Sequence, residues 1–169
     1  IGCGSGLLSI IMAKKGANVV AVDINPEAVE ITKINAAKNM TNITASVSGI
    51  FEEVKGKFDI IVFNAPYLPE DIELRKVASI RRENGIGRLK ELDIMRQWCG
   101  GPTGRETIDI FLRSAVEYME FGGILLVGIS SLTGEEEVLD MIGKNGLKPR
   151  IAARKKVPWE ELIVVEAGA

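Results

Sequence analysis

The chain has 169 residues and a formal net charge of −2, and it contains no histidine. This length predicts a single domain with a sizeable core, and the near-neutral charge provides no general basic field for nucleic acid. The absence of histidine excludes Ser-His triads and imidazole acid–base catalysis, and it disfavours a zinc enzyme, so we expect no metal site. The two cysteines, Cys3 and Cys99, are far apart in the chain. They predict free thiols in a reducing compartment, and no apolar run is long enough to cross a membrane, so we expect a cytoplasmic protein.

The first sixteen residues, "IGCGSGLLSIIMAKKG", indicate a glycine-rich turn that leads into a helix. A turn of this kind normally follows a central parallel strand, and we expect that strand to precede Ile1 in the parent chain. The dinucleotide-binding pattern G-x-G-x-x-G would need a glycine where Leu7 stands, so nicotinamide and flavin are disfavoured. The loop glycines still allow a ligand to approach backbone N–H groups closely, although a tight turn without a ligand explains them as well. These glycines are Gly2, Gly4 and Gly6.

Residues 18–24, "NVVAVDI", are predicted to form a buried strand that ends near Asp23. Asn25 and Pro26 then suit the N-cap and first position of a helix that reaches about Asn39. A carboxylate after the second strand typically binds ribose hydroxyls in nucleotide-binding folds. The alternative is that Asp23 is only a favourable negative charge at the start of the next helix.

The rest of the chain continues to alternate between strand and helix patterns. Further strands are expected at 43–47, 58–63, 124–129, 150–157 and 162–167. T-x-x-E boxes at Thr103–Glu106 and Thr133–Glu136 predict two more helices, the first of which ends at Gly122. The fold class is therefore α/β, a doubly wound and mostly parallel sheet in a single domain over residues 1–169.

The strand at 58–63 ends in Asn64-Ala65-Pro66-Tyr67. An amide or aromatic amino nitrogen is a poor nucleophile because its lone pair is delocalised. Two acceptors, the Asn64 side-chain oxygen and the Ala65 carbonyl, would orient that lone pair and stabilise the positive charge that develops on nitrogen. Pro66 would fix their directions, and Tyr67 would stack on the planar group. The alternative is an ordinary turn.

Three stretches together carry a resemblance to a known family: "IGCGSGLLSI", "AVDINPEAVEITKINAAKN" and "FDIIVFNAPY". They resemble class I S-adenosylmethionine-dependent methyltransferases with a seven-stranded-type sheet, here without its first strand. "WCGGPTGRETIDIFL" is similar to a segment of the HemK-related release-factor glutamine methyltransferases, archaeal and eukaryotic branch. The resemblance implies S-adenosyl-L-methionine as cofactor and Asn64 to Tyr67 as the catalytic motif. The cofactor-binding residues that it implies are Gly2, Gly4, Gly6, Asp23, Ile24, Gly49, Ile50 and Asn64.

The chain departs from the family pattern at two positions. Ala65 stands where the family has proline, but the backbone carbonyl used there is retained, and Pro66 keeps Ala65 extended. Gly49 stands where relatives carry an aspartate that accepts a hydrogen bond from the adenine amino group. Adenine would then depend on backbone groups and on packing against Ile50 and Phe51, so we expect weaker cofactor binding.

The resemblance implies a release factor as substrate, methylated on the glutamine amide of its Gly-Gly-Gln loop. Two alternatives remain open, namely methylation of an exocyclic amino nitrogen of adenine or guanine in RNA or DNA, and an inactive cofactor-binding subunit. Residues 68–102 are predicted to form a substrate-facing lid, since they follow the motif directly and the segment 75–105 is rich in arginine. Since close eukaryotic relatives work with a small zinc-binding activator protein, the resemblance also implies such a partner here, and the strand region "ITASVSGIF" is its candidate edge.

Overall fold

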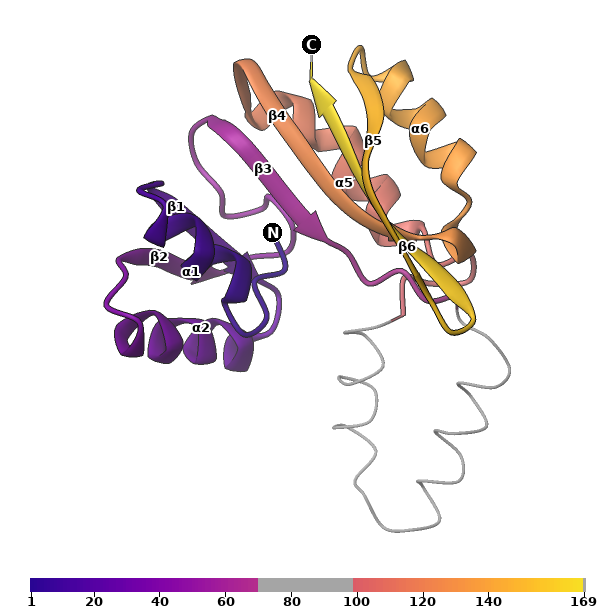
Figure 1. Cartoon of the computed structure of the whole chain (residues 1–169). Coiled ribbons are helices and arrows are strands. Elements are labelled where there is room, and N and C mark those ends of the chain that lie inside the picture. Colours follow the sequence, from indigo (N-terminus) through magenta and orange to yellow (C-terminus); the bar gives the residue numbers. More distant parts are fainter. Residues whose placement is uncertain (70–98, 169) are drawn as a thin grey trace, which may run out of the picture. The chain divides into compact units, whose positions relative to one another are not determined.

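The computed structural model describes residues 1–69 and 99–168 (Figure 1). These residues belong to two compact units, Ile1–Lys57 and Phe58–Ala169, which are described one at a time. The predicted lid at 68–102 lies mostly outside the described residues, so the role of this segment stays a prediction.

The first unit contains two helices and two parallel strands. Its elements are α1 (Leu7–Lys14), β1 (Val19–Asp23), α2 (Pro26–Lys38) and β2 (Ile43–Val47). The register of β1 with β2 runs from Val19 opposite Ile43 to Asp23 opposite Val47. The start of α2 confirms the predicted cap, because the Asn25 side chain accepts a hydrogen bond of 2.9 Å from the Glu27 N–H and Pro26 is the first helical residue.

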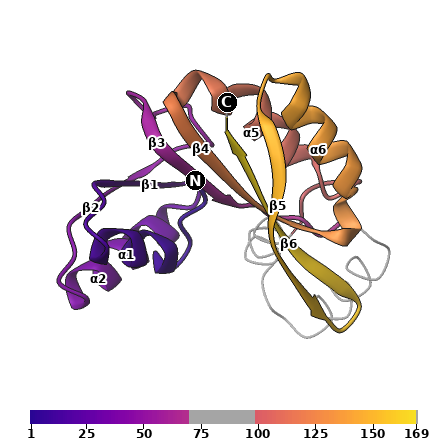
Figure 2. The ribbon, with the colours of Figure 1, turned by 45° about the horizontal axis from the view of Figure 1, so that its top comes forward.

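The second unit is built on a four-stranded sheet in the order β3-β4-β6-β5. Strand β3 is parallel to β4, whereas β6 is antiparallel to both of its neighbours. Helices α5 and α6 lie on the same face of this sheet, which is visible in both ribbon views (Figures 1 and 2). The elements are β3 (Phe58–Asn64), α5 (Glu106–Ala115), η1 (Val116–Tyr118), β4 (Met119–Ser130), η2 (Ser131–Thr133), α6 (Glu135–Lys144), β5 (Lys148–Val157) and β6 (Glu160–Gly168).

The core of the second unit lies between the sheet and these two helices. Phe111 of α5 is fully buried, and its ring lies 4.7 Å from that of Phe63 on β3, centroid to centroid. Other buried side chains come from β4, β6, α5 and α6, namely Leu125, Val127, Ile163, Val165, Ile108, Leu112, Val138 and Ile142. Helix α5 and strand β4 therefore both contribute buried apolar side chains to this core.

The prediction that the helix after Thr103 reaches Gly122 was wrong. α5 ends at Ala115, and Gly122 lies within β4, with a φ of 75°. The reason is pairing with β3: Met119 is opposite Phe58, but Ile124 is opposite Ile60. The extra residues of β4 bulge out of the ladder, and glycine accommodates the left-handed backbone there.

Both predicted capping boxes were also only partly right. α5 begins at Glu106 itself, with Arg105 as N-cap, and the Glu106 carboxylate accepts hydrogen bonds from the N–H and hydroxyl of Thr103 at 3.1 Å. α6 begins at Glu135 after Gly134, and the Thr133 hydroxyl donates to the Ser130 carbonyl at 2.6 Å. In neither case does the threonine side chain cap a helix N–H: Thr103 donates to the Glu106 side chain, and Thr133 donates to a backbone carbonyl of the preceding turn.

Within the described residues, no helix is long and apolar enough to cross a membrane. The same part of the chain holds no group of three or more Cys, Asp or Glu residues placed to bind a metal ion. Strand β5 lies at one edge of the four-stranded sheet, and its residues from Ala152 to Lys156 are exposed. Its two arginines pair with glutamates, Arg150 with Glu166 at 2.7 Å and Arg154 with Glu161 at 2.9 Å.

Candidate active site

The glycine loop of the first unit adopts a left-handed backbone at each of its three glycines, with φ of 64° at Gly2, 53° at Gly4 and 80° at Gly6. A Cβ on Gly6 would lie 3.0 Å from the hydroxyl of buried Thr32 on α2, so that helix packs directly on the loop. At Gly4 no atom lies within 4 Å of the same position. The loop is therefore held tightly on one side and is open at Gly4, as close approach of a ligand requires.

Asp23 fastens this loop to the end of β1. One carboxylate oxygen accepts the Gly4 N–H at 2.9 Å, and the other accepts the Asn25 N–H at 2.9 Å. An ionised carboxylate has about four lone-pair sites, so each oxygen retains capacity for a further donor. The side chain is thus oriented by backbone groups and can still accept hydroxyl groups from a ligand.

An apolar side chain and a strained turn flank Asp23. Ile24 is 75% exposed although it follows a buried strand. The turn after β2 starts with buried Ser48, whose N–H donates to the Asp23 carbonyl at 2.9 Å, and contains Ile50 at a φ of 50°. A β-branched residue rarely adopts a positive φ, and such strain is concentrated at functional positions.

Glu52 is a residue that sequence reasoning missed. Its carboxylate oxygens lie 2.8 and 3.0 Å from the position that a Cβ would occupy on Gly49. The Glu52 carboxylate therefore folds back over Gly49, into the space where an aspartate at that position would place its own oxygens. The signal in the sequence is a glutamate three residues after the glycine, at a distance that a one-turn loop can bridge.

In the second unit, Asn64 is the last residue of β3 and is exposed, while Ala65 is 3% exposed. Asn64 pairs with Gly128 on β4, and its side-chain oxygen lies 2.7 Å from the position of a Cβ on Gly128. Any other residue at 128 would push the Asn64 amide out of its position. Gly128 is thus a second residue that the sequence did not single out, although a glycine inside an apolar strand often marks such a close approach.

The Gly-Gly-Pro-Thr-Gly segment packs against the backbone of the Asn-Ala-Pro-Tyr loop. A Cβ on Gly100 would lie 2.5 Å from the Pro66 carbonyl oxygen, and one on Gly104 would lie 2.5 Å from that of Tyr67. The Gly100 N–H donates to the Leu68 carbonyl at 2.9 Å, next to a parallel bridge between Leu68 and Cys99. Two motifs that are about 35 residues apart in the sequence therefore form one rigid unit, which only glycines permit.

Glu106 and Arg105 stabilise that unit. The carboxylate of Glu106 also accepts the Arg105 N–H at 3.1 Å. Partial desolvation acts to raise the pKa of Glu106, but the hydrogen bonds from Thr103 and Arg105 outweigh it and hold the pKa below its usual value. The Arg105 guanidinium lies 3.3 Å from Asp109 and donates to the Thr133 carbonyl at 3.3 Å, so it joins α5 to the turn after β4.

Two further groups near these loops stay neutral. Burial and the neighbouring Glu160 carboxylate raise the pKa of Tyr67, which keeps its phenol protonated. Burial raises the pKa of the Cys3 thiol against a weaker opposing effect of its hydrogen bond with Thr32. Cys3 is a free thiol, as predicted, and its raised pKa disfavours the reactive thiolate form.

Comparison with known proteins places these features in a family. A model of the methyltransferase small domain matches residues 1–80. A putative protein N5-glutamine methyltransferase of Methanocaldococcus jannaschii is 44% identical over 168 residues, which cover 99% of this chain and 78% of that relative. The chain belongs to the class I S-adenosylmethionine-dependent methyltransferases, in the HemK-related group. Methyltransferase HEMK2 of Mus musculus is 29% identical over 175 residues, with 98% of this chain and 74% of the relative covered.

Solved structures show the same fold. The Mtq2–Trm112 complex of E. cuniculi, described as responsible for methylation of the eRF1 translation termination factor, has a TM-score of 0.68 at 21% identity and covers 98% of this chain and 80% of its own. The 16S rRNA N2 G1207 methyltransferase of T. thermophilus, solved with AdoMet and guanosine, has a TM-score of 0.68 at 19% identity. The match covers 99% of this chain and 36% of that methyltransferase. The expected Rossmann-like fold, the S-adenosylmethionine cofactor and the methyltransferase activity are confirmed.

Proposed function

We propose that this enzyme methylates the side-chain amide of a glutamine in a peptide chain release factor, and that Asn64 holds the acceptor nitrogen. The observation that supports it most strongly is the place of the Asn64 amide, at the carboxyl end of β3 and directly beside Gly128. Ligands of open α/β sheets bind beyond the carboxyl ends of the strands. The relatives named for protein glutamine methylation support a protein acceptor.

The first unit has groups that fit the cofactor. Its open loop at Gly4 can admit the ligand to the backbone, and the Asp23 carboxylate has unused lone pairs for ribose hydroxyls. Exposed Ile24 and strained Ile50 supply apolar surface for the adenine ring. When bound, S-adenosylmethionine supplies an electrophilic methyl group.

Glu52 takes over the hydrogen bond that relatives make from an aspartate at the position of Gly49. Its carboxylate lies over Gly49 and is exposed, so it can accept the exocyclic amino group of adenine. The predicted weakening of cofactor binding through Gly49 is then reduced, because a longer side chain brings the same acceptor from the next turn.

The acceptor side of the reaction depends on the chain's own polar groups. The Asn64 side-chain oxygen and the Ala65 carbonyl accept the two N–H hydrogens of the substrate amide and turn its lone pair toward the methyl group. They also stabilise the positive charge that grows on nitrogen in the transition state. Such stabilisation by preorganised dipoles is usually the largest single contribution to catalysis. The nitrogen becomes acidic once alkylated, so no histidine or other strong base is needed before attack.

Ala65 preserves this arrangement although the family has proline there. Its side chain is buried and the following Pro66 keeps it extended, while Gly100 and Gly104 pack against the backbone of Pro66 and Tyr67. Tyr67, neutral at physiological pH, walls the planar amide. The glycine-rich segment thereby replaces part of the stiffness that a second proline would have given.

A small partner protein that supports the enzyme is a further part of the proposal. Strand β2 pairs with β1 on one side, and within the described residues no strand pairs with its other edge. Val47 at the end of β2 is 46% exposed. A zinc-binding activator of the kind expected from the resemblance would add to this edge. Co-purification and solution scattering that show a soluble, fully active monomer would remove the partner from the account.

The substrate is tested by incubating the enzyme and labelled S-adenosylmethionine with a release factor, a release factor whose Gly-Gly-Gln glutamine is replaced, and tRNA. Mass spectrometry should locate one methyl group on the loop glutamine and none on the replaced variant. Labelling of tRNA alone would favour the alternative, methylation of an exocyclic base nitrogen in nucleic acid. That alternative uses the same Asn64 geometry, but the net charge of −2 gives it no general attraction to nucleic acid.

A further inference from the structure

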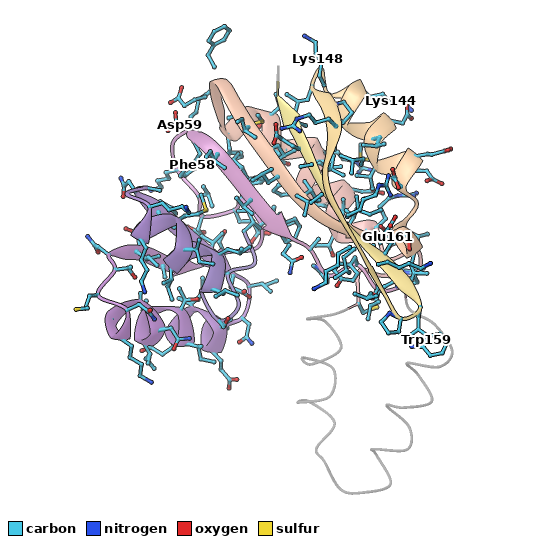
Figure 3. All side chains as sticks on the ribbon, viewed as in Figure 1. Phe58, Asp59, Lys144, Lys148, Trp159 and Glu161 are labelled. Carbon is cyan, nitrogen blue, oxygen red and sulfur yellow. The ribbon has the colours of Figure 1, made fainter. Side chains whose placement is uncertain are left out.

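Trp159 lies at the tip of the β5–β6 hairpin (Figure 3) and has an unfavourable backbone conformation there. Val157 pairs with Glu160, so the loop consists of Pro158 and Trp159 alone. Trp159 has a φ of 80°, and this value after a proline is typical of a type II turn. That position favours glycine or asparagine, because a Cβ there is crowded by the backbone.

Among the residues that the structure describes, almost nothing covers the tryptophan side chain. It is 96% exposed, so its burial does not offset the backbone strain. A bulky aromatic residue that is both strained and unpacked in the free protein points to contact with a partner, since tryptophan is among the residues that contribute most to protein interfaces.

The hairpin tip is firmly connected to the acceptor side of the sheet. The Ser130 hydroxyl, at the end of β4, donates a hydrogen bond to the Glu160 carboxylate, and the Glu161 N–H donates to the Ser131 hydroxyl at 3.0 Å. Glu160 in turn raises the pKa of Tyr67, so its carboxylate lies near the Asn-Ala-Pro-Tyr loop. Because β3 and β4 are parallel, with Asn64 opposite Gly128, the tip and Asn64 lie at the same carboxyl edge.

We propose that Trp159 is a substrate-docking residue that contacts the polypeptide around the acceptor glutamine, an inference that rests on the proposed function. The charges favour a protein over RNA. Lys155 and Lys156 on one strand are balanced by Glu160 and Glu161 on the other, and Lys156 lies directly opposite Glu161. A neutral tip does not attract phosphates, whereas a rigid, exposed indole suits an apolar or backbone surface of a folded protein.

The test is steady-state methylation of an intact release factor by Trp159→Gly, with Trp159→Tyr as the variant that keeps an aromatic ring. Trp159→Gly should raise KM for the release factor about tenfold or more, while kcat and S-adenosylmethionine affinity stay within twofold. Trp159→Tyr should recover most of that loss. Thermal unfolding of Trp159→Gly should be unchanged or occur at a higher temperature, since glycine suits the positive φ.

Phe121→Ala is the matched control. Phe121 is as exposed as Trp159 but lies near the start of β4, at the end of this strand far from the hairpin tip. Its KM should equal that of the wild type. An unchanged KM in Trp159→Gly would overturn the inference, as would loss of tRNA binding without any change toward the release factor. Failure of the wild type to methylate the release factor at all would instead overturn the proposed function.

Discussion

The side-chain oxygen of Asn64 lies 2.7 Å from the point where a Cβ would stand on Gly128 of the neighbouring strand. Gly128→Ala should therefore displace the Asn64 amide from its present position. We expect kcat to fall about 10–10²-fold, because misplacement of a positioning group by about 1 Å is costly. Affinity for S-adenosylmethionine should stay within twofold, as measured by calorimetric titration.

Gly143→Ala is the control for this prediction. Gly143 lies in α6, and no atom approaches the position of its Cβ within 4 Å. Replacement there should leave kcat unchanged and stabilise the helix by about 0.5–1 kcal/mol. Equal activity of the two alanine variants would show that Gly128 does not position Asn64.

Asp23→Ala should weaken S-adenosylmethionine binding about tenfold or more, since a hydrogen bond to a charged group contributes about 1.5–3 kcal/mol. The same change removes the acceptors of the Gly4 and Asn25 N–H groups, so the unfolding temperature should be recorded beside the calorimetric titration. Asp59→Ala, at the exposed start of β3, should leave the affinity unchanged. Wild-type affinity in folded Asp23→Ala would contradict the assignment.

Glu52→Ala should reduce S-adenosylmethionine affinity about threefold to tenfold, less than Asp23→Ala. Glu52 is exposed, so water competes for its charged carboxylate, and we expect about 0.5–1.5 kcal/mol from its single hydrogen bond. Glu53→Ala is a close control, because Glu53 is the next residue and is equally exposed, while its backbone N–H, which the substitution keeps, is what binds Ser48. Competition between S-adenosylmethionine and an analogue that lacks the adenine amino group measures the effect directly. The analogue has no amino group for the Glu52 carboxylate to accept, so it should bind Glu52→Ala, Glu53→Ala and the wild type with the same affinity.

Glu106→Gln tests the loop that backs the acceptor motif through its dependence on pH. The pKa of Glu106 is lowered in the folded state, so its ionised form stabilises the fold above its ordinary pKa, and this contribution is lost as the pH falls through the lowered value. Thermal unfolding should therefore show Glu106→Gln below the wild type at pH 7, with the difference shrinking at acidic pH below about 4.

Glu117→Gln, at an exposed position of η1, is the control and should unfold at the wild-type temperature at pH 7. A difference between wild type and Glu106→Gln that grows on acidification would mean that the carboxylate does not hold the Gly100–Arg105 turn.

Much of the fold could be predicted because local patterns and tertiary packing agree. Asn25-Pro26 marked the start of α2, and the apolar run before Asn64 marked β3. The position of Asn64 at a strand end was predictable for the same reason. The end of α5 was not, since the bulge at Gly122 depends on how β4 pairs with Phe58 and Ile60 of β3.

The supporting contacts of the site lay beyond sequence reasoning. Gly128 opposite Asn64, and Gly100 against the Pro66 carbonyl, each require a register or a loop contact between distant segments. Glu52 requires the conformation of one turn, in which Ile50 has a positive φ. A sequence shows which residues bear chemical groups, whereas the close approaches that fix their positions follow from the ladder and from the steric allowance of glycine.

The role of Asn64 in holding the acceptor amide is tested most directly by single-turnover methyl transfer to the release factor with Asn64→Ala. The account predicts a rate lower by about 10²–10³, with S-adenosylmethionine affinity within a few-fold of wild type, because one preorganised polar contact made in the transition state is lost. Ala65→Pro, which retains the backbone carbonyl, should transfer at the wild-type rate or faster. Full transfer by Asn64→Ala would contradict the account and reduce this strand end to an ordinary turn.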